Sequence, residues 1–175
     1  MKRIAIQGEL GSFHDITAHE YFQGEQIELI CCATFEEVFE NIKRDPTIIG
    51  ICAIENTIAG SLLHNYELLR ESGTTVVGEH KLHIEHSICC LPSDDWSTLQ
   101  EVHSHPVGLM QCGKFLANHP DLKAVEAEDT AGSAAFIAQH QVHGWAAICS
   151  AYAARMYGMK VLQEGIHDNP HNYTR

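Results

Sequence analysis

Basic side chains are scarce in this sequence, which has 11 Lys and Arg residues against 23 Asp and Glu and a formal net charge of −12. The cations are scattered along the chain, whereas nucleic-acid binding needs a basic stripe that follows the phosphates. We therefore expect no nucleic-acid partner. An anionic small-molecule substrate is compatible with the sequence, provided that a local positive potential at its site offsets the repulsion from the negative net charge of the chain.

Long apolar runs are also missing. Uncharged apolar stretches such as residues 47–54 are far too short to cross a bilayer. The first residues, MKRIAIQGE, have no long apolar run after their two cations, so they indicate a β-strand rather than a signal peptide. With 45% apolar and 19% charged residues, the composition is that of a globular chain. These features predict a cytoplasmic protein with no membrane partner.

Motifs for metals and redox chemistry are absent as well, since neither C-x-x-C nor H-E-x-x-H occurs among seven Cys and 13 His residues. Apolar, strand-like runs contain four of the cysteines, namely Cys31, Cys52, Cys89 and Cys149. We interpret them as reduced and buried. The stretch HKLHIEH spaces three imidazoles regularly, but strand alternation puts His83 on the opposite face from His80 and His86. We interpret these imidazoles as solvated in preference to the alternative of a structural metal site, and we predict no metal and no cofactor.

The hydrophobic pattern alternates strands with helices along the whole chain. Strands are predicted at residues 2–8, 27–33, 47–54, 74–80, 122–128, 145–150 and 159–165, with a long extended run at 81–91 and a short element at 97–104. Helices are predicted at residues 14–24, 34–44, 61–73, 106–119, 130–140 and 151–158. Thr34 and Glu37 form a capping box, while Ser61 and Gly73 are expected to begin and end their helix.

This alternation predicts an α/β fold with parallel-rich sheets. The pattern changes near Lys81, so we predict two lobes, residues 1–80 and 81–165, with residues 166–175 returning to the first lobe or to the hinge. Ligands of such sheets bind at the carboxyl ends of the strands, which places the expected site in a cleft between the lobes.

Four strand-to-helix turns carry small or polar residues: GELGSFH, IENTIAGS, HSHPVG and EDTAGS. Free backbone N–H groups at helix N-termini attract carboxylates, so an acidic protein can bind an anion there. The turns nominate a set of substrate-binding residues, namely Gly11, Ser12, Ser61, His105, Thr130 and Ala131. Helix capping alone is the alternative interpretation for Ser61, Ser104 and Thr130.

Taken in order, these turns and three further segments resemble the catalytic domain of prephenate dehydratases. The matching segments run from end to end of the chain: GELGSFH, IENTIAGSLLHNYELL, VVGEHKLHIEHSI, VHSHPVGLMQC, DTAGSAA, AAICSAYAARMYGMKVL and the terminal HNYTR. The resemblance implies a two-lobed fold like that of type II periplasmic binding proteins, with the active site in the interlobe cleft. It also implies loss of water and carbon dioxide from prephenate to give phenylpyruvate, a step of phenylalanine biosynthesis.

Site residues are implied by the same resemblance. The family's Thr-Arg-Phe motif maps its first two residues onto Thr174 and Arg175, and its Asn, Ser and Gln site residues map onto Asn56, Ser104 and Gln111. The motif's Phe is absent because the sequence ends at Arg175, and the regulatory phenylalanine-binding (ACT) domain of the family is also missing. We therefore expect a truncated form, for which feedback inhibition is not predicted.

The resemblance nominates Thr174 as the donor to the departing ring hydroxyl. An alcohol is a very weak acid, so hydrogen-bond assistance without full proton transfer is the physically easier alternative. Arg175 either lowers the cost of an alkoxide or, if residues 173–175 form a strand, lies on the other face and binds a substrate carboxylate. His105 and His171 are alternative general acids, because imidazole titrates near neutrality.

Two competing functions stay open at this point. One is dehydration of arogenate, the amino analogue of prephenate, and the other is a non-catalytic two-lobed protein that binds anions or amino acids. The absence of a secretion signal and the Thr-Arg terminus favour the enzyme over the binding protein. The family resemblance further implies a homodimer or a higher homo-oligomer.

Overall fold

The computed structural model describes all 175 residues and divides into two compact units. Unit 1 comprises Met1–Glu9, Phe13–Ile84 and His171–Arg175, and unit 2 comprises Leu10–Ser12 and Glu85–Pro170. The principal division therefore falls between residues 84 and 85, three to four residues beyond the predicted lobe boundary. The terminal segment belongs to unit 1 from His171 onward.

Unit 1 contains three helices and two small sheets. Its elements are β1 (Lys2–Gln7), α1 (Phe13–Tyr21), β2 (Ile27–Cys32), α2 (Phe35–Arg44), β3 (Ile49–Gly50), β4 (Glu55–Asn56), β5 (Gly60–Ser61), α3 (Leu63–Ser72), β6 (Leu82–His83) and β12 (Tyr173–Thr174). The strand predicted at residues 74–80 is wrong, because these residues pair with no strand and are mostly exposed.

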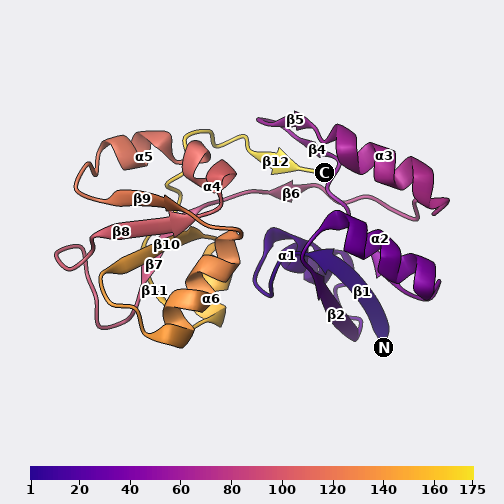
Figure 1. Cartoon of the computed structure of the whole chain (residues 1–175), viewed down its shortest axis with the longest axis horizontal. Helices are drawn as coiled ribbons and strands as arrows, with labels where there is room; N and C mark the ends of the chain where they lie inside the picture. Colours follow the sequence, from indigo (N-terminus) through magenta and orange to yellow (C-terminus); the bar gives the residue numbers. More distant parts are fainter. The chain divides into compact units, whose positions relative to one another are not determined.

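The first sheet of unit 1 is parallel and has the order β2-β1-β3. Strand β1 buries side chains on both faces: Ile4 and Ile6 pack with Ala18 of α1, while Ala5 packs with Val38 of α2. Two helices therefore cover opposite faces of one sheet (Figure 1), which explains the nearly continuous apolar run of β1.

Helix α2 begins at the predicted capping box. The Thr34 side chain accepts a hydrogen bond from Glu37 N at 3.3 Å, and Glu37 Oε2 accepts one from Ala33 N at 2.9 Å. The predicted end of α3 is also confirmed, since Gly73 has a φ of +69° that favours glycine. The predicted cap at Ser61 is wrong, because Leu62 occupies the N-cap position and Ser61 belongs to β5.

The second sheet of unit 1 is antiparallel and has the order β5-β4-β12-β6. The last strand of the chain thus lies between two strands from the first half of the sequence (Figure 1). The sequence pattern predicted neither β4 nor β5, because strands of two residues leave no detectable alternation.

Unit 2 is built on a five-stranded mixed sheet of order β11-β7-β10-β8-β9. Its elements are β7 (Ser87–Cys90), β8 (Glu101–Ser104), α4 (Pro106–Gln111), α5 (Gly113–Ala117), β9 (Lys123–Glu126), α6 (Thr130–His140), β10 (Trp145–Cys149), α7 (Ala151–Met156) and β11 (Lys160–Gln163). The helix predicted at residues 106–119 is interrupted at Cys112, where the backbone leaves helical geometry. The α/β class with parallel-rich sheets is confirmed.

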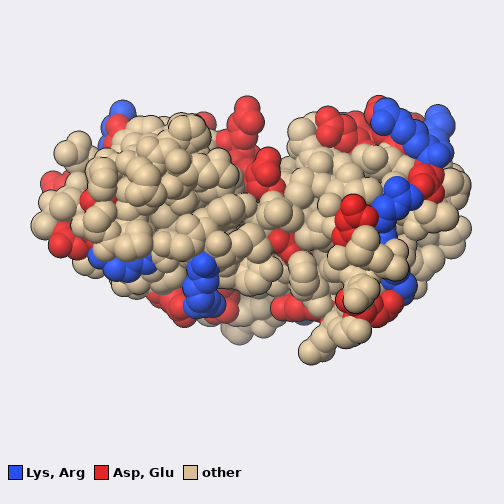
Figure 2. Space-filling model, turned by 90° about the horizontal axis from the view of Figure 1, so that it is seen from below, with Lys and Arg blue, Asp and Glu red and all other residues tan.

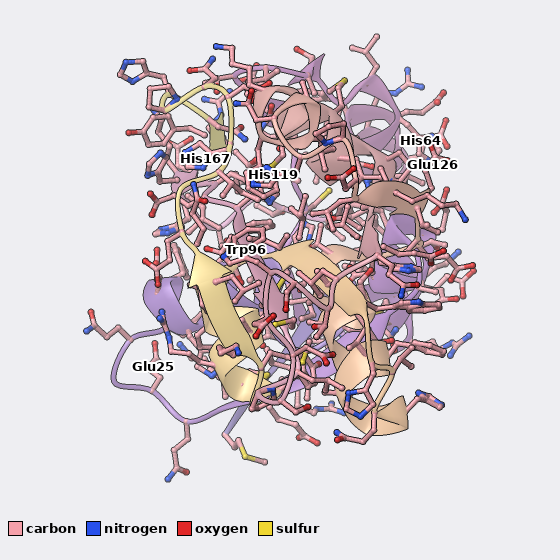
Figure 3. All side chains as sticks on the ribbon, turned by 90° about the vertical axis from the view of Figure 1, so that its left-hand side faces the viewer. Glu25, His64, Trp96, His119, Glu126 and His167 are labelled. Atoms are coloured by element: carbon pink, nitrogen blue, oxygen red, sulfur yellow. The ribbon has the colours of Figure 1, made fainter.

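Both faces of this sheet are apolar. One face packs against α6 and α7 through small side chains such as Ala134 and Ala153, and the other packs against α5 through Phe115. Beside Phe115, the rings of Trp96 and His119 stack at 5.2 Å (Figure 3).

The cysteines only partly follow the prediction. Cys89 and Cys149 are buried and none of the seven cysteines forms a disulfide, but Cys31 is exposed and Cys52 is half-buried. Cys31 is exposed on one face of β2, whereas the neighbouring Cys32 on the opposite face is buried. Burial raises the pKa of Cys52 to about 11, so this thiol is a poor nucleophile at neutral pH.

Acidic residues outnumber basic ones, with 23 Asp and Glu against 11 Lys and Arg. On the face shown in Figure 2, Lys and Arg form small separate groups on each unit rather than a continuous stripe. None of the helices is long and apolar enough to cross a bilayer.

His14, near the start of α1, gives unit 1 a predicted sensitivity to acid. Burial lowers the pKa of its imidazole to about 4, against a hydrogen bond with the backbone of Gln7, and its Nε2 atom has no partner. Below the ordinary value of 6.5 the unfolded chain takes up a proton that the folded chain refuses until about pH 4. The free energy of unfolding should therefore fall as the pH is lowered from 6.5 to about 4, by up to about 1.4 kcal/mol per pH unit.

Urea unfolding followed between about pH 7.5 and pH 4.5 tests this sensitivity. We expect His14→Gln, which does not titrate, to show a shallower loss of stability than the parent. The exposed His140→Gln variant serves as the control and should follow the parent. Equal slopes for His14→Gln and the parent would contradict the assignment.

Candidate active site

The terminal strand β12 is held on both sides by main-chain hydrogen bonds. On the β4 side, Arg175 N donates to Glu55 O at 2.8 Å and Thr57 N donates to Tyr173 O at 2.9 Å. On the β6 side, Ile84 N donates to Asn172 O at 2.8 Å. The Thr-Arg terminus is therefore extended and paired on both sides. The interpretation of Arg175 as a carboxylate-binding residue depended on this extended conformation.

Strand alternation separates Thr174 from Arg175. Thr174 is paired directly with Asn56 and Leu82, so these three side chains share one face of the sheet. Tyr173 and Arg175 point to the other face. Arg175 is consequently not placed to stabilise an alkoxide on Thr174, and the alternative role, carboxylate binding, is the one compatible with the strand.

Asn56 organises the Thr174 face. Its Nδ2 amide donates to Thr174 Oγ1 at 3.0 Å and to Asn172 Oδ1 at 2.8 Å, while its Oδ1 accepts from the backbone of Ile58 and Ala59, both at 2.9 Å. Because Thr174 Oγ1 accepts from Asn56 and its own hydrogen has no acceptor in the chain, the hydroxyl is left as a donor. This is the state that assistance to a leaving hydroxyl requires.

Asn172 is a member of this network that the sequence analysis did not nominate. Its side chain has no exposed surface, its Oδ1 accepts from Asn56, and its Nδ2 has no partner. It shares the Thr174 face because it lies two residues earlier on the same extended segment. The alternation of HNYTR, with strand pairing assumed, was the signal that would have grouped Asn172 with Thr174.

The opposite face carries Arg175 in a pocket of about 380 Å³. The pocket is lined by Glu55, Asn56, Thr57, Gly60, Ser61, Lys81, Tyr173 and Arg175. Arg175 pairs with Glu55 at 2.7 Å and with Glu79 at 3.8 Å, and Lys81 lies 4.5 Å from the centre of the Tyr173 ring. The Glu55 charge, the Tyr66 hydroxyl and the Glu79 charge raise the pKa of Arg175, so the guanidinium stays charged.

In unit 2, Ser104 lies at the end of β8 where α4 approaches the sheet. It is completely buried, and its hydroxyl donates to Ile148 O at 2.7 Å. A Cβ atom on Gly108 would lie 2.7 Å from Ser104 Oγ and 3.3 Å from Thr130 Cγ2, so only glycine allows this approach. The predicted capping role of Ser104 is wrong, because His105 is the N-cap of α4.

Gln111 lies on the last turn of α4 and is only 7% exposed. Its Oε1 is 2.8 Å from His86 Nε2. Its own Nε2 amide forms no hydrogen bond with the chain, so Gln111 is a buried side chain with two unused donors. His86 was not nominated by the sequence analysis, which interpreted it as a solvated imidazole, and this interpretation is wrong.

The remaining predicted residues occupy loop and helix ends of unit 2. His105 Nδ1 accepts from Val107 N at 3.2 Å, which uses the ring as a cap rather than as a general acid in this structure. Thr130 begins α6, but Asp129 is the N-cap, and Ala131 is buried beneath it. Gly11 has a φ of +87°, and the neighbouring Ser12 is buried.

Comparison with known proteins decides the family. Residues 4–175 match the sequence profile described as prephenate dehydratase. The chain belongs to the prephenate dehydratase family. The family resemblance that the sequence motifs indicated is therefore confirmed.

The relatives of this chain include proteins named arogenate dehydratase and proteins named prephenate dehydratase. The chain is 37% identical to arogenate dehydratase 3, chloroplastic, of Arabidopsis thaliana and 32% identical to the bifunctional chorismate mutase/prephenate dehydratase of Escherichia coli K12. Each match covers 99% of this chain but 41% and 45% of the relative, respectively. The chain spans less than half the length of these relatives.

A solved structure titled as a quorum-quenching acylase, GqqA, has the same fold, with a TM-score of 0.86 and 28% identity over 98% of this chain and 61% of that one. In unit 2 the Ser104 hydroxyl donates to a backbone carbonyl rather than to a base. Acyl transfer through Ser104 therefore has no support in its hydrogen bonding.

Proposed function

We propose that the chain catalyses the decarboxylating dehydration of prephenate to phenylpyruvate, within phenylalanine biosynthesis. The observation that carries the proposal is the Asn56–Thr174 hydrogen bond of 3.0 Å, which leaves the Thr174 hydroxyl as a donor. Thr174 donates a hydrogen bond to the departing ring hydroxyl. As the C–O bond breaks, the bond to the ring carboxylate also breaks and gives its electron pair to the aromatic ring, which releases carbon dioxide, and a proton from solvent completes the water. Hydrogen-bond assistance suffices here, since Arg175 lies on the other face of β12 and cannot stabilise an alkoxide.

The other nominated residues bind and orient the substrate in this proposal. Arg175 binds a carboxylate, and Ser61 lines the same pocket. In unit 2, the free amide of Gln111 donates to a substrate oxygen, and the backbone at Gly11, Ser12, His105, Thr130 and Ala131 supplies further contacts. The buried Ser104 orients the site indirectly, by supporting α4 from beneath. The predicted cleft between the lobes stays a prediction, as do the cytoplasmic location and a homo-oligomeric state.

Phenylpyruvate formation from prephenate by the purified chain tests the proposal, with phenylalanine formation from arogenate, the amino analogue, assayed in parallel. We expect turnover of prephenate. Turnover of arogenate alone would assign the amino substrate that the plant relative's name carries. Tight binding of prephenate without turnover would favour the non-catalytic binding protein.

Replacement of Arg175 by Lys should weaken substrate binding, because an ammonium cannot reproduce bidentate contact with a carboxylate. We expect KM to rise about tenfold with a smaller change in kcat, which corresponds to about 1.4 kcal/mol of binding free energy. Initial rates over a range of prephenate concentrations measure this. Arg70→Lys on the exposed face of α3 is the matched control. Unchanged KM and kcat in Arg175→Lys would refute the role.

A further inference from the structure

His86 is a buried titratable side chain of unit 2 that the proposed chemistry does not yet use. It precedes β7 directly, and only 2% of its surface is exposed. Its backbone is fixed at both polar groups: His86 N donates to His167 Nδ1 at 3.3 Å, and Ile166 N donates to His86 O at 3.0 Å. Figure 3 labels His167 in the segment that precedes β12. The ring therefore has a defined position.

The contact with Gln111 determines which ring nitrogen carries hydrogen. Gln111 Oε1 is a carbonyl oxygen and can only accept, so His86 Nε2, at 2.8 Å, must be the donor. Burial lowers the pKa of His86, against the hydrogen bond to Gln111 and with the help of His167, so the ring is neutral at neutral pH. A neutral ring with hydrogen on Nε2 is a single tautomer.

Hydrogen on His86 Nε2 and the Gln111 oxygen facing it require each other, so a ring kept in this tautomer holds the amide in one direction. Rotating the amide by half a turn would place its N–H2 group against the N–H of His86, two donors facing each other. The amide is therefore held with its oxygen on His86 and its two N–H groups turned away. Those N–H groups have no partner in the chain, so they are available to an acceptor on a ligand.

We propose that His86 is a positioning residue that orients the Gln111 amide so that it presents hydrogen-bond donors, and only donors, to an anionic oxygen of the substrate. The inference rests on the proposed role of Gln111 as a substrate contact. It adds His86 as the group that makes Gln111 a hydrogen-bond donor at this contact. The ligand atom must then be an acceptor, such as a carboxylate oxygen.

The tautomer is tested first, on the complete 15N-labelled chain, by correlation spectra that distinguish protonated from bare imidazole nitrogens. Signals lost in His86→Phe, or in His86→Gln if the Phe variant does not fold, identify His86. We expect hydrogen on Nε2 and a bare Nδ1. Hydrogen on Nδ1 would overturn the proposal whether or not the chain turns over prephenate.

A double-mutant cycle on phenylpyruvate formation then tests the coupling. His86→Phe should lower kcat by roughly 10- to 100-fold, the loss expected when a group in contact with substrate is misplaced. The same substitution in a Gln111→Ala background should have less than about a twofold further effect, because there is no amide left to orient. Ile88→Val, a core change on the adjacent strand β7, controls for lost packing and should keep the parent kcat.

The outcomes separate this inference from the proposed function. Parent-like activity of Gln111→Ala would overturn the role of Gln111 itself. Loss of activity in Gln111→Ala together with parent-like His86→Phe would overturn the positioning role alone. Equal effects of His86→Phe in both backgrounds would also overturn it, since the residue would then act only through stability.

Discussion

Thr174→Ala is expected to lower kcat for phenylpyruvate formation by about 10²–10⁴-fold, the range that a positioned proton donor supplies. The alanine keeps the main chain of β12, whose hydrogen bonds to β4 do not involve the side chain. It removes the one hydroxyl on that face whose hydrogen has no acceptor in the chain. KM should change little, because the proposed carboxylate contact comes from Arg175 on the opposite face.

Thr174→Ser is the matched variant for this prediction. Serine retains the hydroxyl and its acceptor role toward Asn56, so we expect it to keep activity within about tenfold of the parent. Steady-state kinetics of the parent and both variants, with circular dichroism to confirm folding, give the comparison. If alanine were as active as the parent, the hydroxyl would have no part in the reaction and His105 or His171 would become the stronger candidates.

Long helices and buried strands were predictable because their patterns span many residues. The predicted helix at residues 130–140 agrees with α6 at both ends, and the capping box of α2 is present as predicted. The run at 47–54 shows the opposite case, since only Ile49–Gly50 pairs as a strand. An apolar run indicates burial, but pairing depends on distant segments that local pattern does not contain.

The candidate site likewise has residues that the sequence predicted and contacts that depend on distant segments. Family motifs nominated Asn56 and Thr174, and the register of β4 and β12 puts them opposite each other. The sequence alone left the face of Arg175 open, because alternation has meaning only once residues 173–175 are known to be extended. His86 and Asn172 were missed because their partners, Gln111 and Asn56, are distant in the sequence, so local pattern gives no sign of either pairing.

Asn56→Asp is expected to impair both activity and folding, although the two side chains have nearly the same shape. The new carboxylate has no hydrogen to donate, so it would face Asn172 Oδ1 with an unfavourable oxygen–oxygen contact where the parent has a 2.8 Å hydrogen bond. It would also accept the Thr174 hydroxyl hydrogen and so remove the proposed donor. We expect kcat to fall at least about 100-fold and the free energy of unfolding to fall by about 3 kcal/mol.

Asn41→Asp on α2 is the control, because its amide donates to Glu37 O within its own helix and to Cys32 Sγ, away from β12. Urea unfolding and steady-state kinetics of both variants distinguish the causes. If Asn56→Asp were destabilised but fully active where folded, Asn56 would support the strands without setting the direction of the Thr174 hydroxyl. Loss of kcat beyond the unfolded fraction shows that the amide keeps the hydroxyl hydrogen directed at the substrate, which is the feature on which the proposed reaction depends.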